Sequence, residues 1–277
     1  MVVSLKLKKG ISKLNDLSKT RVVSIANQKG GVGKTTTAIN LATALVSIGN
    51  RVLIIDLDAQ GNASTGLGIP VEDRQLSTYD VIVDNSDLRS IIKNSLVDGL
   101  FIAPATTDLS SADVDLVSND KRTMVLKHSI VKLLESNSRY DYILIDCPPA
   151  LSLLTINAFV ACETVLVPLQ AEFFALEGLS QLMTTIKEVR GTLNEDIRIQ
   201  GIVLTMYDKR NNLSVQIEED VREHLGGLVY ETVIPRNVRL SEAPSFSLPA
   251  LLYDRKCAGS IAYKKLAAEF LERESKL

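Results

Sequence analysis

Short apolar runs recur along the chain at intervals that are typical of alternating strands and helices. The runs are rich in Val, Ile and Leu, and they are short enough to be buried strands. They cover residues 21–26, 51–57, 100–104, 142–147, 165–169, 199–205 and 229–234. Strands that are apolar throughout are typical of a parallel sheet, because helices cover both of its faces.

Segments with apolar residues at helical spacing lie between most of these runs. We expect helices at residues 35–48, 155–162, 177–190, 214–224 and 260–273. This alternation predicts an α/β fold, a mostly parallel twisted sheet with helices on both faces. In such a sheet, ligands bind at the carboxyl ends of the strands.

One motif joins the first predicted strand to the first predicted helix. It reads KGGVGKTT and comprises Lys29, Gly30, Gly31, Val32, Gly33, Lys34, Thr35 and Thr36. Its glycines let backbone amides point at phosphate oxygens, and the N-terminus of the following helix also favours negative charge. Lys34 is placed to reach the β- and γ-phosphates, the Thr35 hydroxyl suits Mg²⁺, and Thr36 adds a hydroxyl near the α-phosphate. The chain lacks the first glycine of the ordinary pattern GxxxxGK[ST] and matches the variant KGGxGK[ST].

Three aspartates fall at or just beyond the ends of predicted strands. Asp56 and Asp58 end the run VLIIDLD, and Asp146 ends the run ILID just before two prolines. One of the first two carboxylates can orient a water on Mg²⁺ and the other can orient the attacking water. Asp146 has the pattern of a Walker B carboxylate, which holds the metal shell.

Composition and charge narrow the classes of protein. With 277 residues and 45% hydrophobic content, the chain can bury one large core, and we expect a single domain over residues 21–277. The formal net charge of −2 gives no global sign of nucleic-acid binding, so such a role must rest on a local patch. Cys147, Cys162 and Cys257 form no CxxC and suit a reducing cytosol. Without a membrane span or signal peptide in the sequence, we expect a cytoplasmic protein.

Residues 1–20 form a basic extension ahead of the first predicted strand. Its lysines are Lys6, Lys8, Lys9, Lys13 and Lys19, interspersed with apolar residues. We expect a partly ordered arm, and the alternative is a basic arm that touches DNA or lipid. The extension is too short to hold a helix-turn-helix domain.

Six segments spread along the chain form a recognisable series. They read KGGVGKTTTAINLA, DLDAQGNASTGLG, ILIDCPPALSLLTINA, QAEFFALEGLSQL, LTMYDKR and VIPRNVRLSEAPS. Together they resemble the ParA/Soj family of chromosome- and plasmid-partitioning ATPases, a branch of the deviant Walker A group that also contains MinD. The resemblance runs from residue 21 to residue 272 and implies the P-loop NTPase fold of that group.

The resemblance implies catalytic roles for three residues. Lys29 corresponds to the signature lysine, which crosses a dimer interface to the nucleotide phosphates bound by the other subunit. Lys34 corresponds to the lysine that serves the nucleotide of its own chain. Asp58 corresponds to the aspartate that positions the hydrolytic water. Many family members have proline where this chain has Ala59, a change that should loosen this turn.

The resemblance also implies metal and adenine contacts. Thr35 corresponds to the magnesium ligand, Asp56 to an aspartate near the metal shell and Asp146 to the Walker B residue. Pro235 and Asn237 of the segment IPRN correspond to positions that contact the adenine. The implied cofactors are therefore ATP and Mg²⁺.

The activity implied by the resemblance is ATP hydrolysis coupled to DNA partitioning. The ATP-bound homodimer of the family binds nonspecific double-stranded DNA, and a ParB-type centromere-binding protein stimulates hydrolysis and releases it. We accordingly expect a cytoplasmic, nucleoid-associated protein without membrane contact. The cargo, whether chromosome, plasmid or another body, is left open.

Candidate DNA contacts are basic residues near the later motifs, since phosphate contacts need cations. They are Lys187, Arg190, Lys209, Arg210, Arg236 and Arg239. Acidic residues are interspersed among them. Dimerisation would double the patch, which explains how an acidic monomer could bind DNA only with ATP.

Three alternatives share the phosphate loop. A MinD-like membrane ATPase needs a basic amphipathic C-terminal helix, whereas glutamates offset the lysines of SIAYKKLAAEFLERESKL, so we expect this last helix to pack on the sheet. A reductase of the nitrogenase iron protein type needs cluster cysteines, for which Cys147 is the candidate. A scaffold that binds ATP without hydrolysing it is opposed by Asp58.

Overall fold

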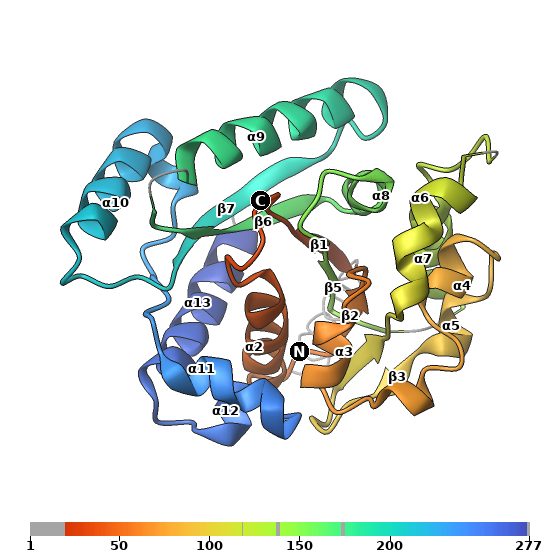
Figure 1. Ribbon diagram of the computed structural model, residues 1–277, viewed down its shortest axis with the longest axis horizontal. Helices are drawn as coiled ribbons and strands as arrows, with labels where there is room; N and C mark the ends of the chain where they lie inside the picture. Colours follow the sequence, from red (N-terminus) through yellow and green to blue (C-terminus); the bar gives the residue numbers. More distant parts are fainter. Residues whose placement is uncertain (1–19, 118, 137–138, 173–174, 276–277) are drawn as a thin grey trace, which may run out of the picture.

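The fold is built on a seven-stranded sheet in the order β3-β4-β2-β5-β1-β6-β7 (Figure 1). The structure, a computed structural model, describes residues 20–117, 119–136, 139–172 and 175–275. The strands are β1 (Arg21–Ile25), β2 (Val52–Asp56), β3 (Lys93–Asn94), β4 (Leu100–Ala103), β5 (Tyr142–Asp146), β6 (Thr164–Gln170) and β7 (Arg198–Thr205). All pair in parallel except β3, which is antiparallel to β4 at one edge. The predicted α/β fold with a mostly parallel sheet is confirmed.

Helices cover both faces of the sheet (Figure 1). One face carries α2 (Lys34–Ser47), α3 (Asn62–Gly66), α11 (Val238–Glu242), α12 (Ala250–Tyr253) and α13 (Ala258–Glu274). The other carries α4 (Thr78–Ile82), α5 (Leu88–Ile91), α6 (Ala112–Asp115), α7 (Val125–Glu135), α8 (Leu153–Ala161), α9 (Ala175–Thr192) and α10 (Asn212–Leu225). Short 3₁₀ turns are η1 (Val71–Asp73), η2 (Thr107–Ser111), η3 (Gly226–Leu228) and η4 (Ala243–Phe246).

The central strand β5 shows why its sequence is apolar without a break. Ile143 and Ile145 belong to the hydrophobic cluster on one face of the sheet. Tyr142 and Leu144 belong to the cluster on the opposite face. Successive side chains of a strand point to opposite faces, so a strand with helices on both sides needs apolar residues at every position.

The last helix, α13, packs into the core, as the sequence predicts. Its side chains Tyr263, Leu266 and Phe270 are buried, and the helix lies against α2. Tyr263 also shares a hydrogen bond of 3.1 Å with the hydroxyl of Thr37 on α2. Within the residues that the structure describes, no helix combines the length and apolar character needed to cross a bilayer.

The predicted strand at 229–234 is wrong. This segment follows the edge of β7 through isolated bridges at Val229 and Pro235. Between the bridges, the amides of Glu231 and Thr232 each donate to the carboxylate of Glu269 on α13 at 2.9 Å. Because those amides bind a side chain instead of β7, the ladder cannot continue.

The helices between residues 62 and 135 were not predicted. Of these, α3 to α6 are each four or five residues long and too short to show a period. The longer α7, of 11 residues, was missed as well. Most of the N-terminal extension, residues 1–20, lies outside the described residues. The exception is Thr20, whose hydroxyl donates to the carbonyl of Tyr140 at 2.7 Å. The division into an extension and a single domain at 21–277 stays a prediction.

Ser247 offers a test of the backbone of the η4 turn. Its φ of 56° and ψ of 31° are left-handed, a conformation that costs a non-glycine residue about 1–2 kcal/mol. Ser247→Gly should therefore raise the free energy of unfolding by about 1 kcal/mol, measured by urea denaturation. Ser245→Gly, within η4, is the matched control and should lower stability. Equal effects of the two changes would contradict the strain at Ser247.

Candidate active site

The phosphate loop lies between the carboxyl end of β1 and the first turn of α2 (Figure 1). Gly31 and Gly33 adopt φ values of 76° and 88°, which side chains rarely allow. Gly33 is the N-cap of α2, so the loop feeds directly into the helix N-terminus. The strand, loop and helix that a phosphate site requires are all present.

Lys34 is held inside this loop. Its side chain is buried, and its Nζ donates to the carbonyl of Lys29 at 2.9 Å. Burial lowers the pKa of Lys34, and the negative charge of Asp146 nearby counteracts part of that shift. An ammonium group that caps a carbonyl of its own loop can transfer to a phosphate oxygen without moving far.

Lys29 is bound differently from Lys34. Its ammonium group forms an ion pair with Glu172, between β6 and α9, and each of the two side chains is about one-third exposed. The loop entry is fixed by Asn27, whose side chain accepts from the amide of Lys29 at 3.0 Å and donates to the carbonyl of Pro168 at 2.8 Å. Lys29 therefore lies at the surface on an anchored backbone.

Asp56 and Asp146 end neighbouring strands in register and are both fully buried. Asp56 accepts hydrogen bonds from the amide and hydroxyl of Ser64 at 2.9 and 2.7 Å and from the amide of Asp58 at 3.2 Å. Burial raises the pKa of Asp56 to about 6, although the bonds from Ser64 oppose the rise. Burial and the neighbouring Asp56 together raise the pKa of Asp146 well above its usual range.

Asp146 has the properties of a cation ligand. Among the described residues, neither of its carboxylate oxygens makes a hydrogen bond of standard geometry. The hydroxyl of Thr35 lies near enough to lower its pKa in part. A buried carboxylate with unused oxygens beside a hydroxyl fits Mg²⁺, which prefers oxygen ligands.

The other ligands of such a cation would come from outside the protein. The described part of the chain holds no group of three or more His, Cys, Asp or Glu side chains arranged to bind a metal. Mg²⁺ usually keeps several waters and takes phosphate oxygens of its substrate. Thr35 and Asp146 therefore suit a cation that arrives with a nucleotide, and Asp56 lies beside them.

Asp58 stands at the start of a turn after β2. Its Oδ1 accepts from the amide of Gln60 at 3.0 Å, and its carbonyl accepts from the amide of Gly61 at 2.8 Å. The residue is partly exposed, whereas Asp56 is buried. Its carboxylate is thus held by the backbone at the open side of the site, where a water can reach it.

A cavity of about 330 Å³ adjoins the loop and contains both predicted adenine residues, Pro235 and Asn237. Gly33 and Thr36 of the phosphate loop line it too. The Oδ1 atom of Asn237 is buried there, and no donor in the described residues reaches it. An amide oxygen without a donor suits the exocyclic amine of adenine.

Sequence reasoning missed two residues of this cavity, Thr205 and Met206. The hydroxyl of Thr205 donates to the carbonyl of Val32 at 2.8 Å and so ties the end of β7 to the phosphate loop. Met206 has a left-handed φ of 49°, which turns the chain sharply after β7. The motif LTMYDKR contains both residues, but their contacts depend on the neighbouring loop and cannot be read from the motif.

Three of the predicted DNA contacts share one groove. Lys209, Arg210 and Arg236 line a cavity of about 950 Å³ together with Lys265 of α13, which sequence reasoning missed. Arg210 is paired with Asp208 at 2.7 Å. We call the surface formed by these four cations the basic groove.

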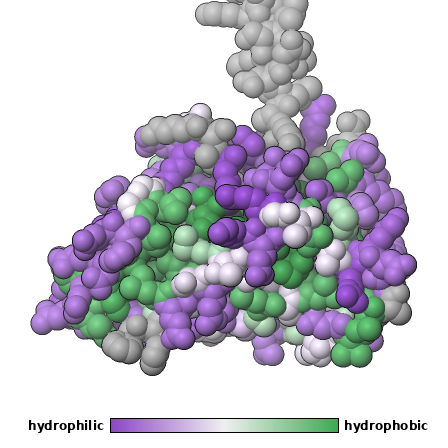
Figure 2. Space-filling model, turned by 90° about the horizontal axis from the view of Figure 1, so that it is seen from above, coloured by the Kyte–Doolittle hydropathy of each residue, from purple (hydrophilic) through white to green (hydrophobic). Residues whose placement is uncertain are grey.

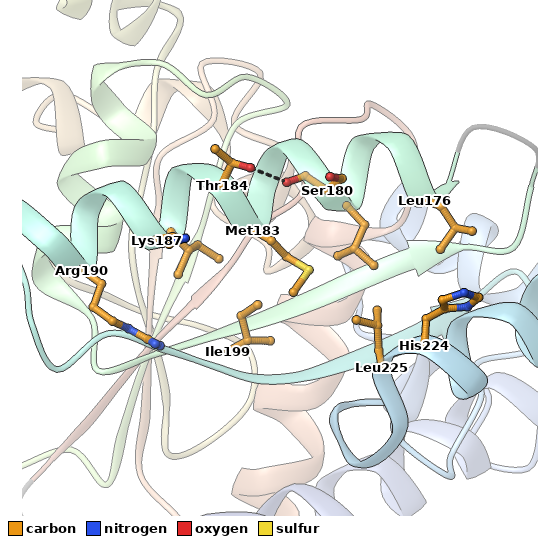
Figure 3. Close-up of a pocket in the computed structure, with 11 residues that line it drawn as sticks. Leu176, Ser180, Met183, Thr184, Lys187, Arg190, Ile199, His224 and Leu225 are labelled. Carbon is orange, nitrogen blue, oxygen red and sulfur yellow. Dashed lines mark hydrogen bonds between the residues drawn. The ribbon is translucent and has the colours of Figure 1, made fainter.

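The other predicted DNA contacts lie apart from the basic groove. Arg239 pairs with Glu242 and Asp254 at 2.8 and 3.8 Å. Lys187 and Arg190 line a mainly apolar cavity of about 670 Å³ between α9 and α10 (Figure 3). The left half of Figure 2, where these helices face the viewer, shows hydrophobic surface between hydrophilic side chains. The Nε of Arg190 donates to the carbonyl of Ile197 at 2.6 Å, so this cation supports a loop.

Comparisons with known proteins agree with this geometry. A family profile described as an AAA domain matches residues 20–199. The chromosome partitioning protein ParA of Caulobacter vibrioides is 56% identical over 254 residues, which cover 92% of this chain and 95% of that protein. The chain belongs to the ParA/Soj family.

Two further comparisons cover nearly the whole chain. The sporulation initiation inhibitor protein Soj of Bacillus subtilis is 49% identical over 249 residues, 90% of this chain and 97% of that protein. Among solved structures, cobyrinic acid a,c-diamide synthase from Mycobacterium smegmatis with a bound ATP analog and magnesium superposes with a TM-score of 0.80 and 33% identity, covering 93% of this chain and 96% of that one.

Within this ParA/Soj chain, Cys147 does not have the properties of a cluster ligand. The thiol is almost fully buried, and burial raises its pKa well above the usual range. Metal clusters are bound by cysteine thiolates, and the raised pKa of Cys147 disfavours the thiolate form. Burial of α13 similarly removes the amphipathic face that a MinD-like membrane anchor needs.

The loop assignment predicts that Lys34→Ala loses ATP affinity by tenfold or more, because the ammonium group would no longer meet the phosphates. Titration calorimetry with ATP measures the change. Lys187→Ala, in the cavity of Figure 3, is the control and should bind ATP as the unsubstituted protein does. Unchanged affinity in Lys34→Ala would remove Lys34 from the site.

Proposed function

We propose that this chain is a Mg²⁺-dependent ATPase that partitions DNA, since its relatives include a chromosome partitioning protein ParA and a chromosome-partitioning ATPase Soj. One observation carries the proposal: the fully buried carboxylate of Asp146, without standard hydrogen bonds among the described residues, lies beside the phosphate loop. A buried carboxylate left in this state is costly, and a cation delivered with a nucleotide would satisfy it.

The proposed chemistry is transfer of the γ-phosphoryl group to water. Lys34 and the amides of the glycine-rich loop hold the β- and γ-phosphates, and they stabilise the charge that develops on them. Mg²⁺, when bound at Thr35 and Asp146, supplies further neutralisation of the phosphate oxygens. Asp58 orients the attacking water from its turn at the open side of the site.

The proposed active unit is a homodimer with ATP between the subunits. Lys29 supports this proposal because its side chain is at the surface, on a loop whose entry Asn27 fixes. The ion pair with Glu172 is partly exposed, and such pairs contribute about 0–1 kcal/mol. Lys29 can therefore leave Glu172 at little cost and serve a nucleotide bound by the other subunit.

The proposed partners are nonspecific double-stranded DNA and a ParB-type protein, with nucleoid association as the result. The basic groove favours DNA, because its four cations outnumber the two acids that also line it, Asp208 and Glu231, while the chain as a whole carries a formal charge of −2. The groove also shares Pro235, Arg236 and Val238 with the adenine cavity. Nucleotide binding and DNA binding can thus influence each other through a common wall.

Asp58→Ala should separate hydrolysis from assembly. We expect ATP-dependent dimers and DNA binding to persist, and ATP turnover to fall by about 100-fold or more, because the attacking water loses its acceptor. Phosphate release measures the ATP turnover, and light scattering measures the ATP-dependent dimers. Asp108→Ala, on the exposed turn after β4, is a matched control. Normal turnover in Asp58→Ala would favour a scaffold that binds ATP without hydrolysing it.

The basic groove and the cavity between α9 and α10 lead to different expectations for DNA binding. Arg236→Glu, in the basic groove, should weaken DNA retention by about tenfold at moderate salt and reduce its salt dependence. Lys187→Glu makes the same charge change in the cavity between α9 and α10 and should have little effect. Gel shifts with ATP over a range of salt concentrations measure both. Stronger weakening by Lys187→Glu would place the DNA surface on α9.

A further inference from the structure

Arg74 is a buried arginine bound mainly to carbonyl oxygens. Its side chain is only 6% exposed, and it follows η1 on the side of the sheet that carries α3. Its Nε and Nη2 donate to the carbonyl of Ile69 at 3.1 and 2.6 Å, and Nη1 donates to the carbonyl of Ala105 at 3.1 Å. Nη2 also donates to the hydroxyl of Thr65 at 2.8 Å.

These acceptors belong to two segments that Arg74 connects to the turn after Asp58, since its Nη1 also donates to the carbonyl of Gly61 at 3.5 Å. Thr65 and Ile69 lie on and just after α3, which follows the turn that Asp58 begins. Ala105 follows β4, the strand beside β2. The planar guanidinium group binds both segments at once, and its donors have a fixed geometry that a lysine ammonium group on its flexible stem does not reproduce.

The turn itself is packed against the guanidinium group. Gly61, whose amide closes the turn onto the carbonyl of Asp58, has a left-handed φ of 59°. A Cβ atom at Gly61 would collide with Nη1 of Arg74 and would lie 3.1 Å from the carbonyl oxygen of Ala105. Arg74 therefore fixes how closely this turn can approach the end of β4.

A second connection joins the same segments to the metal side of the site. The hydroxyl of Ser64 donates to Asp56 at 2.7 Å and accepts from the amide of Ala105 at 3.0 Å. Ser64 and Arg74 thus hold the start of α3 between Asp56 and Ala105. The backbone that carries Asp58 is braced on both sides.

We propose that Arg74 is a positioning residue for ATP hydrolysis, which holds the turn at residues 58–61 so that the Asp58 carboxylate meets the attacking water. The inference rests on the proposed function of Asp58. The hydrogen bonds of Arg74 go to protein groups around this turn, so Arg74 would act on hydrolysis through the turn. A displacement of about 1 Å at a catalytic group can lower a rate by about 100-fold.

The test compares three variants of the chain in its full length. Arg74→Met removes the donors while keeping a long side chain. Gly61→Ala keeps Arg74 and perturbs the turn itself, because the added methyl group would meet the guanidinium group and the left-handed backbone at Gly61 disfavours a side chain. Arg273→Met is the matched control, because Arg273 also binds backbone carbonyls, those of Gly227, Leu228 and Val229, far from the active site.

For each variant, ATP affinity, the ATP-dependent dimer fraction and phosphate release per dimer are measured, with thermal unfolding as the check on folding. We expect Arg74→Met and Gly61→Ala to lower turnover per dimer by roughly tenfold to 100-fold, with ATP affinity within about twofold of the unsubstituted protein. Arg273→Met should lower the unfolding temperature without changing turnover per dimer. Arg74→Lys, which keeps the cation but not the planar set of donors, replaces Arg74→Met if that variant does not fold, and it should lower turnover per dimer in the same direction.

Three results would overturn the inference. Unchanged turnover in folded Arg74→Met and Gly61→Ala would show that the turn does not need the arginine. If the Arg74, Gly61 and Arg273 variants all lose ATP affinity and turnover to the same extent, Arg74 only stabilises the fold in general. Full turnover in Asp58→Ala would contradict both the proposed catalytic role of Asp58 and this inference. If Asp58→Ala loses turnover while the Arg74 and Gly61 variants keep it, only the inference about Arg74 is overturned.

Discussion

The in-register pairing of β1, β5 and β2 is the constraint on which the rest of the site depends. Ile25 pairs with Asp146, and Asp146 pairs with Asp56 on its other side. Parallel strands deliver their carboxyl ends to one edge, so this register alone brings the phosphate loop and the two buried carboxylates together. A shift of β5 by one residue would turn Asp146 to the opposite face and separate it from Asp56 and Lys34.

Much of this centre could be predicted because its signals are local. Adjacent residues are enough to identify the loop at residues 29–36, the apolar strands and the aspartates at the strand ends. The predicted strand at 229–234 failed because Glu269, distant in sequence, takes the amides of Glu231 and Thr232. Thr205 and Arg74 were missed for the same reason, since their importance comes from carbonyls elsewhere in the chain.

The basic residues show the same difference between what the sequence indicates and what depends on tertiary structure. The sequence marks six cations as candidate DNA contacts but cannot say which of them share a surface. The structure gathers Lys209, Arg210 and Arg236 with Lys265 in one groove, whereas Arg239 does not line that groove and Arg190 supports a loop. An overall acidic chain can hold a local positive surface because solvent and salt screen charges beyond about 10 Å.

The cavity beside the phosphate loop and the basic groove share one wall, and this arrangement has a thermodynamic consequence. Pro235, Arg236 and Val238 face both spaces. Any rearrangement of these residues by one ligand changes the free energy with which the other binds, and linkage requires the two effects to be equal. If a bound nucleotide raises the affinity of the groove for its ligand tenfold, the bound ligand must raise the affinity for the nucleotide tenfold. Under the proposed function, the affinity for the nucleotide would then be highest for molecules that are bound to DNA.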